Sequence, residues 1–254
     1  MKTAQKWKVE DNELNQLLAS GNMSYASATA PGSDDQALPV PTSLIPAFGM
    51  LRLLCIARES PDIFDIGHVS KRKAFSTLLS RVERVLMDDY ATALAELSKT
   101  NSDEDELTFE IRVATVAGSL IFSYWDLRDM PVSAQPYKHF TQRLRSNLQK
   151  ILRNPSSTPN VPLALLLWLL FQGFKATHID SRESDRTWFV SQASNICKAF
   201  GIDEEDDLEL TIRELVYLKE SDGLYASSFW RAIQDQQQDE DGSDLAWLKR
   251  NAGA

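Results

Sequence analysis

The loop after the most apolar stretch of the chain holds the residues best suited to acid–base chemistry. His178 lies there among charged side chains, which are Asp180, Arg182, Glu183, Asp185 and Arg186. An imidazole beside a carboxylate can accept and return a proton near neutral pH. Charged loops are more often simply solvated, and Asp185 and Arg186 also suit the start of a helix. The loop is therefore a candidate for proton transfer without a defined catalytic residue.

Aromatic side chains flank this loop and offer a second kind of chemistry. A small-molecule pocket between helices would be lined by Trp168, Phe171, His178, Arg186 and Trp188. The alternative is ordinary aromatic core, in which the rings fill space and bind nothing. Both interpretations remain open from the sequence. An enzyme or small-molecule-binding protein is the functional alternative that the pocket would support.

The sequence offers few cysteine and histidine residues that could bind a metal ion. The chain contains two cysteines, Cys55 and Cys197, and three histidines. Each cysteine lies inside an apolar helical pattern and has no partner at the short spacing of a structural zinc site. We therefore expect two buried free thiols, a reducing compartment, no metal and no cofactor.

Both ends of the chain have hydrophobic residues interspersed among acidic ones. Such segments can remain disordered and fold onto the groove of a partner, while the acids keep the hydrophobes in water. The alternative is that the ends dock on the core or do nothing. The hydrophobic residues of these segments are the candidate activation motifs, meaning residues that would bind a coactivator. They are Trp7, Leu14, Leu17, Leu18, Leu245, Trp247 and Leu248.

The elements that must position these residues are helices. Apolar residues recur at helical spacing, and no segment shows sustained period-two alternation. Besides a short amphipathic segment at 7–18, the predicted helices cover residues 43–59, 70–97, 106–128, 137–152, 161–176, 185–200, 208–220 and 224–233. This pattern predicts an all-α fold, an irregular array of about eight or nine helices.

The 161–176 helix is apolar on all sides, so other helices should surround it. It is shorter than the roughly 20 residues that span a bilayer, and Lys175 closes its apolar run. Residues 1–10 are polar, so we expect neither a secretory signal nor a membrane segment. On the 106–128 helix, Ala114, Ala117 and Gly118 should let a neighbouring helix approach closely.

Composition divides the chain into three parts. Residues 1–42 form an amphipathic segment and a linker, residues 43–233 a helical domain, and residues 234–254 an acidic tail that we expect to be disordered apart from 245–248. The net charge is -9, with 27 basic and 36 acidic residues. Because such a surface repels phosphate backbones, we expect no direct nucleic-acid binding by this chain alone.

Residues 163–189 carry a family resemblance. They read LALLLWLLFQGFKATHIDSRESDRTWF, which is an apolar helix with a Leu-Trp pair and a glycine, then a loop, then Arg-x-Trp-Phe. This segment resembles the C-terminal half of the regulatory domain of fungal zinc-cluster transcription factors, also called the fungal-specific transcription factor domain or middle homology region. The similarity extends over about residues 40–235, and its further motifs are Glu110-Ile-Arg-Val-Ala, Tyr124, Leu127-Arg128, Pro131, Phe200-Gly201-Ile202 and 215–217.

The resemblance implies an all-helical regulator that works in the nucleus, and also in the cytoplasm, through contacts with the transcriptional machinery or with a DNA-binding partner. Such factors begin with a six-cysteine zinc cluster that reads the major groove. That cluster is absent from this sequence. The chain is then a truncated family member, a protein that acts through a partner, or the same fold used for another purpose. A homodimer through the 70–97 helix is a further alternative.

Overall fold

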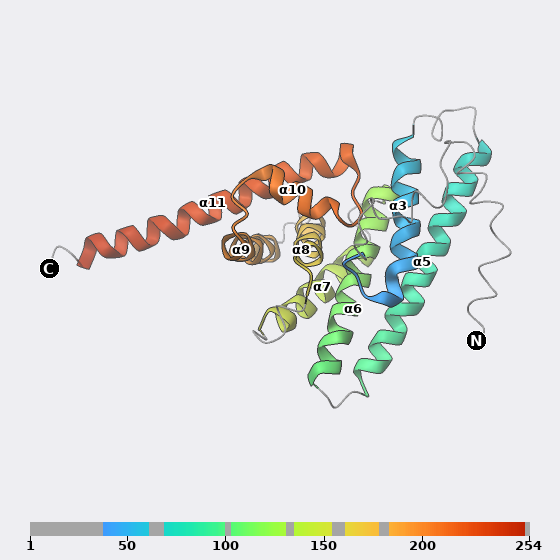
Figure 1. Cartoon of the computed structure of the whole chain (residues 1–254), viewed down its shortest axis with the longest axis horizontal. Helices are drawn as coiled ribbons and strands as arrows, with labels where there is room; N and C mark the ends of the chain where they lie inside the picture. The colour runs from blue at the N-terminus through green and yellow to red at the C-terminus, as the bar shows by residue number, and fades with distance from the viewer. Residues whose placement is uncertain are drawn as a thin grey trace.

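The chain is all-α, as predicted. The computed structural model describes residues 38–60, 69–99, 103–130, 135–153, 161–177 and 183–251. Within them it contains eight α-helices and no strand (Figure 1). The helices are α3 (Ile45–Glu59), α5 (Val69–Leu97), α6 (Asp103–Phe122), α7 (Gln135–Arg153), α8 (Leu163–Thr177), α9 (Glu183–Phe200), α10 (Glu205–Arg213) and α11 (Lys219–Asn251). A 3-10 turn, η1 (Thr42–Leu44), precedes α3, and a π-helical turn, η2 (Ser123–Leu127), continues α6.

Helix α8 is the centre of the fold. Every residue from Ala164 to Thr177 is buried. α6, α7, α9, α10 and α11 all pack against α8. The sequence prediction of an apolar helix surrounded by other helices is therefore confirmed. In the described part of the chain, none of the helices combines the length and the apolar character that a bilayer span requires.

Glycine permits the two closest approaches to this central helix. A Cβ atom added at Gly118 of α6 would lie 2.6 Å from Cδ2 of Leu169. A Cβ atom added at Gly173 of α8 would lie 2.2 Å from Cε1 of Phe189, which belongs to α9. Both distances are shorter than van der Waals contact, so α8 can touch α6 and α9 this closely only where a side chain is missing. The predicted close approach along the 106–128 helix is confirmed at Gly118.

The last third of the domain differs from the prediction. The expected helices at 208–220 and 224–233 appear as α10 and α11, separated by residues 214–218, which we call the strap. Side chains from other elements bind the strap's backbone groups, as described below, and this replaces the helical hydrogen bonds that the periodicity had predicted there.

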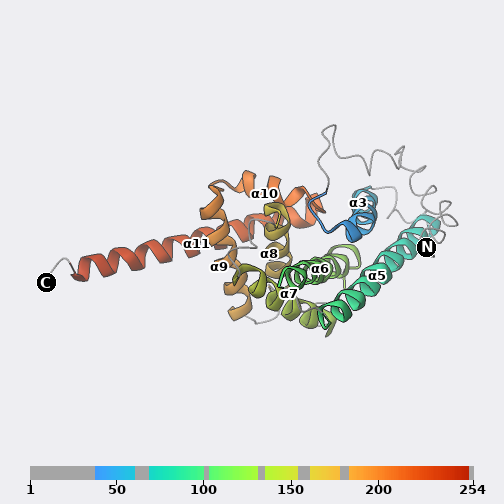
Figure 2. The same cartoon turned by 60° about the horizontal axis from the view of Figure 1, so that its bottom comes forward.

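The predicted disorder of residues 234–254 is wrong for residues 234–251. α11 continues to Asn251 and projects away from the other helices (Figures 1 and 2). Its buried stripe, which includes Ala226, Phe229 and Ile233, gives way to glutamine and acids beyond Ile233. The helix therefore leaves the core but persists, because propagation from a docked first half adds one hydrogen bond per residue and no proline interrupts it. The predicted 7–18 helix lies outside the described residues.

Candidate functional site

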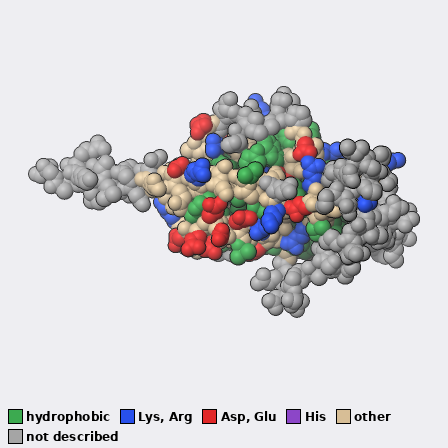
Figure 3. All heavy atoms as spheres, turned by 90° about the horizontal axis from the view of Figure 1, so that it is seen from above, with side chains coloured by type: hydrophobic (Ala, Val, Ile, Leu, Met, Phe, Trp, Pro, Cys, Tyr) green, Lys and Arg blue, Asp and Glu red, His purple; other side chains and the backbone are tan. Residues whose placement is uncertain are grey.

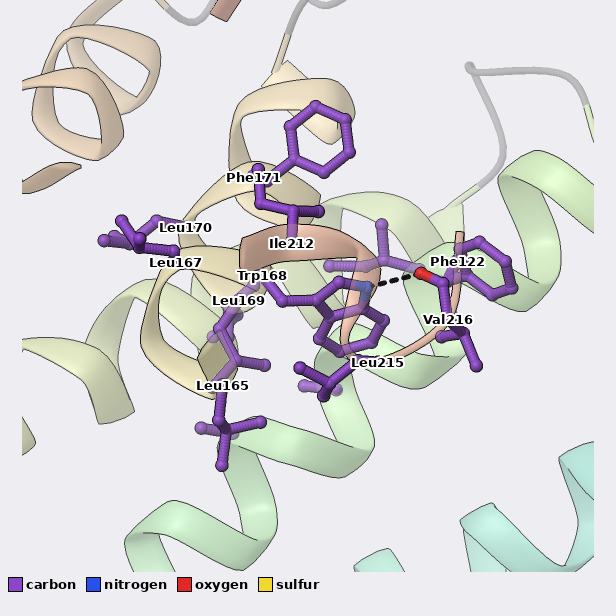
Figure 4. Close-up of a cluster of buried hydrophobic side chains, with 14 of the residues drawn as sticks. Phe122, Leu165, Leu167, Trp168, Leu169, Leu170, Phe171, Ile212, Leu215 and Val216 are labelled. Atoms are coloured by element: carbon purple, nitrogen blue, oxygen red, sulfur yellow. Dashed lines mark hydrogen bonds between the residues drawn. The ribbon is translucent and has the colours of Figure 1, made fainter. Parts of the chain in front are cut away.

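The indole of Trp168 is sealed in the core. Its side chain is 0% exposed, and Nε1 donates a hydrogen bond of 2.9 Å to the carbonyl oxygen of Val216 in the strap. The indole packs against the rings of Phe48 and Phe122, with centroid distances of 5.6 and 6.3 Å. Figure 4 shows the indole directed toward Val216, among aliphatic side chains. Phe171 is also 0% exposed, so both residues fill space in the core.

Two other residues of the predicted pocket, Arg186 and Trp188, are partly exposed on α9. Trp188 lies on α9, partly exposed, with the guanidinium of Arg145 5.4 Å from its ring centroid. Arg186, also on α9, stacks on the ring of Phe174 at 5.1 Å. His178 lies outside the described residues. Two of the five proposed pocket residues are thus core, and two lie on the outer part of α9.

A cluster of charged side chains lies on the same face of α8 as Trp168. Lys175 follows Trp168 by two helical turns, and its side chain is 0% exposed. Nζ of Lys175 donates a hydrogen bond of 2.6 Å to Oδ2 of Asp126 and a second, shorter one to Oδ1 of Asp222. Both aspartate side chains are also 0% exposed. We call Lys175, Asp126 and Asp222 the charged cluster.

The π-helical turn brings Asp126 into this cluster. Such turns insert one residue into a helix and change the direction in which the following side chains point. Arg128, which closes η2, binds both carboxylate oxygens of Glu83 on α5 at 2.6 Å, and Ser123 donates to Glu83 at 2.8 Å. This second network fixes η2 against α5, so the position of Asp126 is set by long-range contacts.

The other half of the cluster belongs to the start of α11. Oδ2 of Asp222 accepts a hydrogen bond of 2.7 Å from the backbone N–H of Leu218, which would otherwise be an unpaired donor at a helix start. The hydroxyl of Ser221 donates to Oδ1 of Asp126 at 2.9 Å. Each of the four carboxylate oxygens of the cluster therefore accepts one hydrogen bond.

The strap that leads into α11 is tied by further side chains. Nε of Arg52, on α3, donates to the carbonyl oxygen of Leu215 at 2.9 Å, and Glu59 of α3 accepts from the backbone N–H of Lys219. Together with the bonds from Trp168 and Asp222, side chains of three helices thus form hydrogen bonds with N–H and carbonyl groups of the chain between α10 and α11. This explains why a buried segment without regular structure is stable here.

Burial controls the ionisation of the cluster. It raises the pKa of Asp126 to about 7; Lys175 opposes this shift and Asp222 adds to it. Burial alone would lower the pKa of Lys175, but the two aspartates outweigh it, so the pKa of Lys175 is raised. Burial, followed by the charges of Asp222 and Asp126, raises the pKa of the nearby Cys55 thiol well above its usual value.

These properties bear on what the cluster can do. A lysine with a raised pKa stays protonated, so it is not a nucleophile at neutral pH. A fully buried cluster also offers a substrate no atom to contact in this conformation. Among the described residues, no group of three or more His, Cys, Asp or Glu side chains is placed to hold a metal ion. The arrangement therefore suits packing and positioning better than catalysis.

Sequence reasoning missed the charged cluster. Its only local signal is Lys175 at the end of an otherwise apolar helix, and a terminal lysine there predicts no buried partner. Of the candidate activation motifs, Trp7, Leu14, Leu17 and Leu18 lie outside the described residues. Leu245, Trp247 and Leu248 belong to the projecting part of α11. Cys55 and Cys197 are buried and free, as predicted.

Comparison of the chain with models of protein families, with curated proteins and with solved structures finds no match. The resemblance to the fungal regulatory domain therefore depends on the motifs quoted from the sequence.

Proposed function

We propose that this protein is a transcription-regulator-like protein, built on a helical regulatory domain of the fungal type, that acts through contacts with other proteins. The observation that carries the proposal is the sealed environment of Trp168. Trp168 and Phe171, two of the five residues that would have lined a pocket, are buried in the core. Function in this chain is then a property of its outer surface, which is where a regulatory domain meets its partners.

The surface is suited to a partner with basic character. The net charge is -9, and Asp203, Glu204, Asp206 and Asp207 are exposed at and before the start of α10. Figure 3 shows carboxylate side chains gathered on the face beside the base of the projecting α11. Such a field favours positively charged protein surfaces and disfavours nucleic acid. We propose contact with the transcriptional machinery or with a DNA-binding partner, and a nuclear location.

The projecting part of α11 provides the most direct test. Residues 234–254 and residues 1–42 are each fused to a foreign DNA-binding domain, and transcription of a reporter gene is measured. We expect activation from at least one fusion, which Leu245→Ala together with Trp247→Ala abolishes in the C-terminal one. The matched control, Lys249→Ala with Arg250→Ala, should keep activity because it leaves the hydrophobes in place.

Silence from both ends, with each fusion expressed and intact, removes the activation part of the proposal. Nuclear import of the full-length protein is a separate measurement. A fluorescent fusion that stays outside the nucleus under all growth conditions contradicts the proposed location.

A further inference from the structure

The charged cluster ties the first turn of α11 to α8 and η2. Asp222 and Ser221, both in α11, bind Lys175 of α8 and Asp126 of η2. The same turns are also held by the bond from the N–H of Lys219 to Glu59, by the ring of Tyr225 5.8 Å from that of Trp125, and by the buried side chain of Ala226. Any change in the charge of the cluster therefore acts on the attachment of α11 to the rest of the domain.

The charges of the cluster do not balance. One ammonium group faces two carboxylates, and all three are 0% exposed. With every group ionised, the core would hold one net negative charge, and an uncompensated buried charge is strongly unfavourable. The rings of Phe122 and Phe171, 5.5 and 5.1 Å from Nζ of Lys175, stabilise the cation and offer nothing to the surplus anion. One bound proton would restore neutrality.

The hydrogen bonds of Asp126 allow it to carry that proton. Its Oδ1 atom lies 2.9 Å from the hydroxyl of Ser221, and a hydroxyl can either donate to a carboxylate or accept from a protonated carboxyl group. Protonation thus reverses this bond without breaking it, while Oδ2 keeps its bond from Lys175. Asp222 lacks this freedom, because Oδ2 of Asp222 faces a backbone N–H that only donates.

Among the described residues, no other group facing the cluster supplies the missing positive charge. The titratable side chains around it are Tyr137 from α7, Tyr217 from the strap, Tyr225 from α11, and Cys55 and Glu59 from α3. Burial raises the pKa of the three tyrosines and of the thiol, so these four stay neutral near pH 7. Glu59 would add further negative charge.

We infer that the charged cluster is a proton-sensitive latch. A proton bound to the carboxyl group of Asp126 keeps the start of α11 attached to α8 and η2, and loss of that proton weakens this attachment. When the start of α11 opens, Asp126 meets water and returns to an ordinary pKa of about 4. The closed form then binds a proton that the open form releases. Rising pH favours opening between the ordinary and the raised pKa, and has no further effect above the raised one.

Hydrogen exchange on the full-length protein tests the latch. Protection factors for backbone amides 218–226 are measured from pH 5 to 8.5 and corrected for intrinsic exchange rates. We expect protection to fall about tenfold per pH unit between about pH 5 and 6.5, and to level off above about pH 7.5. Amides in the last two turns of α5, which lie beyond Glu83 and its bonds to η2, provide the internal reference.

Two variants separate the latch from general acid effects. Asp126→Asn cannot lose a proton, so protection of residues 218–226 should no longer depend on pH. Asp129→Asn is the matched control, because Asp129 lies three residues away, is exposed, and has a φ of 50°, a conformation that asparagine tolerates. It should keep the full pH dependence.

Infrared spectroscopy provides a readout that needs no folded Asp126→Asn variant. At pH 6 in D2O the native protein should show the C=O band of a buried protonated carboxyl group, and this band should disappear as the pH rises to 8.5. The latch is overturned if the protection factors of residues 218–226 do not depend on pH. It is also overturned if the native protein shows no carboxyl band that titrates. Equal pH dependence in Asp126→Asn and Asp129→Asn overturns it as well.

Discussion

Lys175 and Trp168 lie two turns apart on one face of α8, and both hold the chain between α10 and α11. Trp168 binds the carbonyl oxygen of Val216, and Lys175 binds Asp222, which in turn binds the N–H of Leu218. A single helix face thus holds the middle of the strap directly, at Val216, and its last residue, Leu218, through Asp222. This face of α8 therefore contributes to the docking of α11, which also packs against α9 and α10.

Removing the cation of the cluster should be costly. Lys175→Met leaves two buried carboxylates facing each other, so we expect the free energy of unfolding at pH 7 to fall by about 3–5 kcal/mol. Urea denaturation followed by circular dichroism measures this change. Lys138→Met, on the exposed side of α7, is the control and should stay within about 0.5 kcal/mol of the native protein. A loss below about 1 kcal/mol for Lys175→Met would mean that the cluster is hydrated.

Gln172 lies between Trp168 and Lys175 on the same helix, and its side chain is 0% exposed. Neither Oε1 nor Nε2 of its amide has a hydrogen-bond partner among the residues that the structure describes. A buried polar group without a partner costs about 1–3 kcal/mol. Gln172→Met keeps the length of the side chain and removes that cost, so we expect stabilisation of about 1 kcal/mol, measured by thermal and urea unfolding. Destabilisation instead would show that the amide has a partner in solution.

Alanine substitutions should distinguish Gly173, where close packing requires a glycine, from Gly223, where there is space for a side chain. In Gly173→Ala the new Cβ meets the ring of Phe189 at 2.2 Å, so overpacking should cost about 1–3 kcal/mol. In Gly223→Ala the nearest atom is Oη of Tyr217 at 3.7 Å, an ordinary contact, and alanine should stabilise α11 by about 0.5–1 kcal/mol. Opposite signs in the two unfolding curves are expected, and equal signs would contradict the packing described for α8 and α9.

Features set by neighbouring residues could be predicted from the sequence. The apolar residues of the 161–176 segment predicted its burial, and Gly201, with a φ of 68°, ends α9 as its position suggested. The acidic run at 203–207 marks the start of α10, where the helix dipole favours carboxylates. In each of these cases the physical cause lies within one or two turns of the residue concerned.

The charged cluster could not be predicted in this way. Lys175 meets partners 49 and 47 residues away in the sequence, and nothing near Asp126 or Asp222 marks them as buried. Burial of these aspartates depends on the π-helical turn and on the docking of α11, both of which are tertiary effects. The length of α11 was missed for the opposite reason: its acidic composition suggested disorder, although a helix nucleated by a docked half can extend into solvent.

Trp168 and Trp188, the two tryptophans of the predicted pocket, should differ in how much stability is lost when phenylalanine replaces them. Trp168→Phe deletes the donor to the buried carbonyl of Val216 and leaves a small cavity, so we expect a loss of about 2–4 kcal/mol in the free energy of unfolding. Trp188→Phe removes part of a half-exposed contact with Arg145, worth about 0.5–1 kcal/mol.

Urea unfolding of the two variants, followed by circular dichroism, measures both changes on the same scale. Tryptophan fluorescence adds a second criterion, because a sealed Trp168 should be inaccessible to acrylamide in the native protein while Trp188 is quenched. Comparing quenching of the Trp168→Phe and Trp188→Phe variants assigns each signal. If Trp168 is quenched as readily as Trp188, or if its replacement by phenylalanine costs no stability, then the core around α8 is open to solvent. The small-molecule-binding alternative would then replace the regulator.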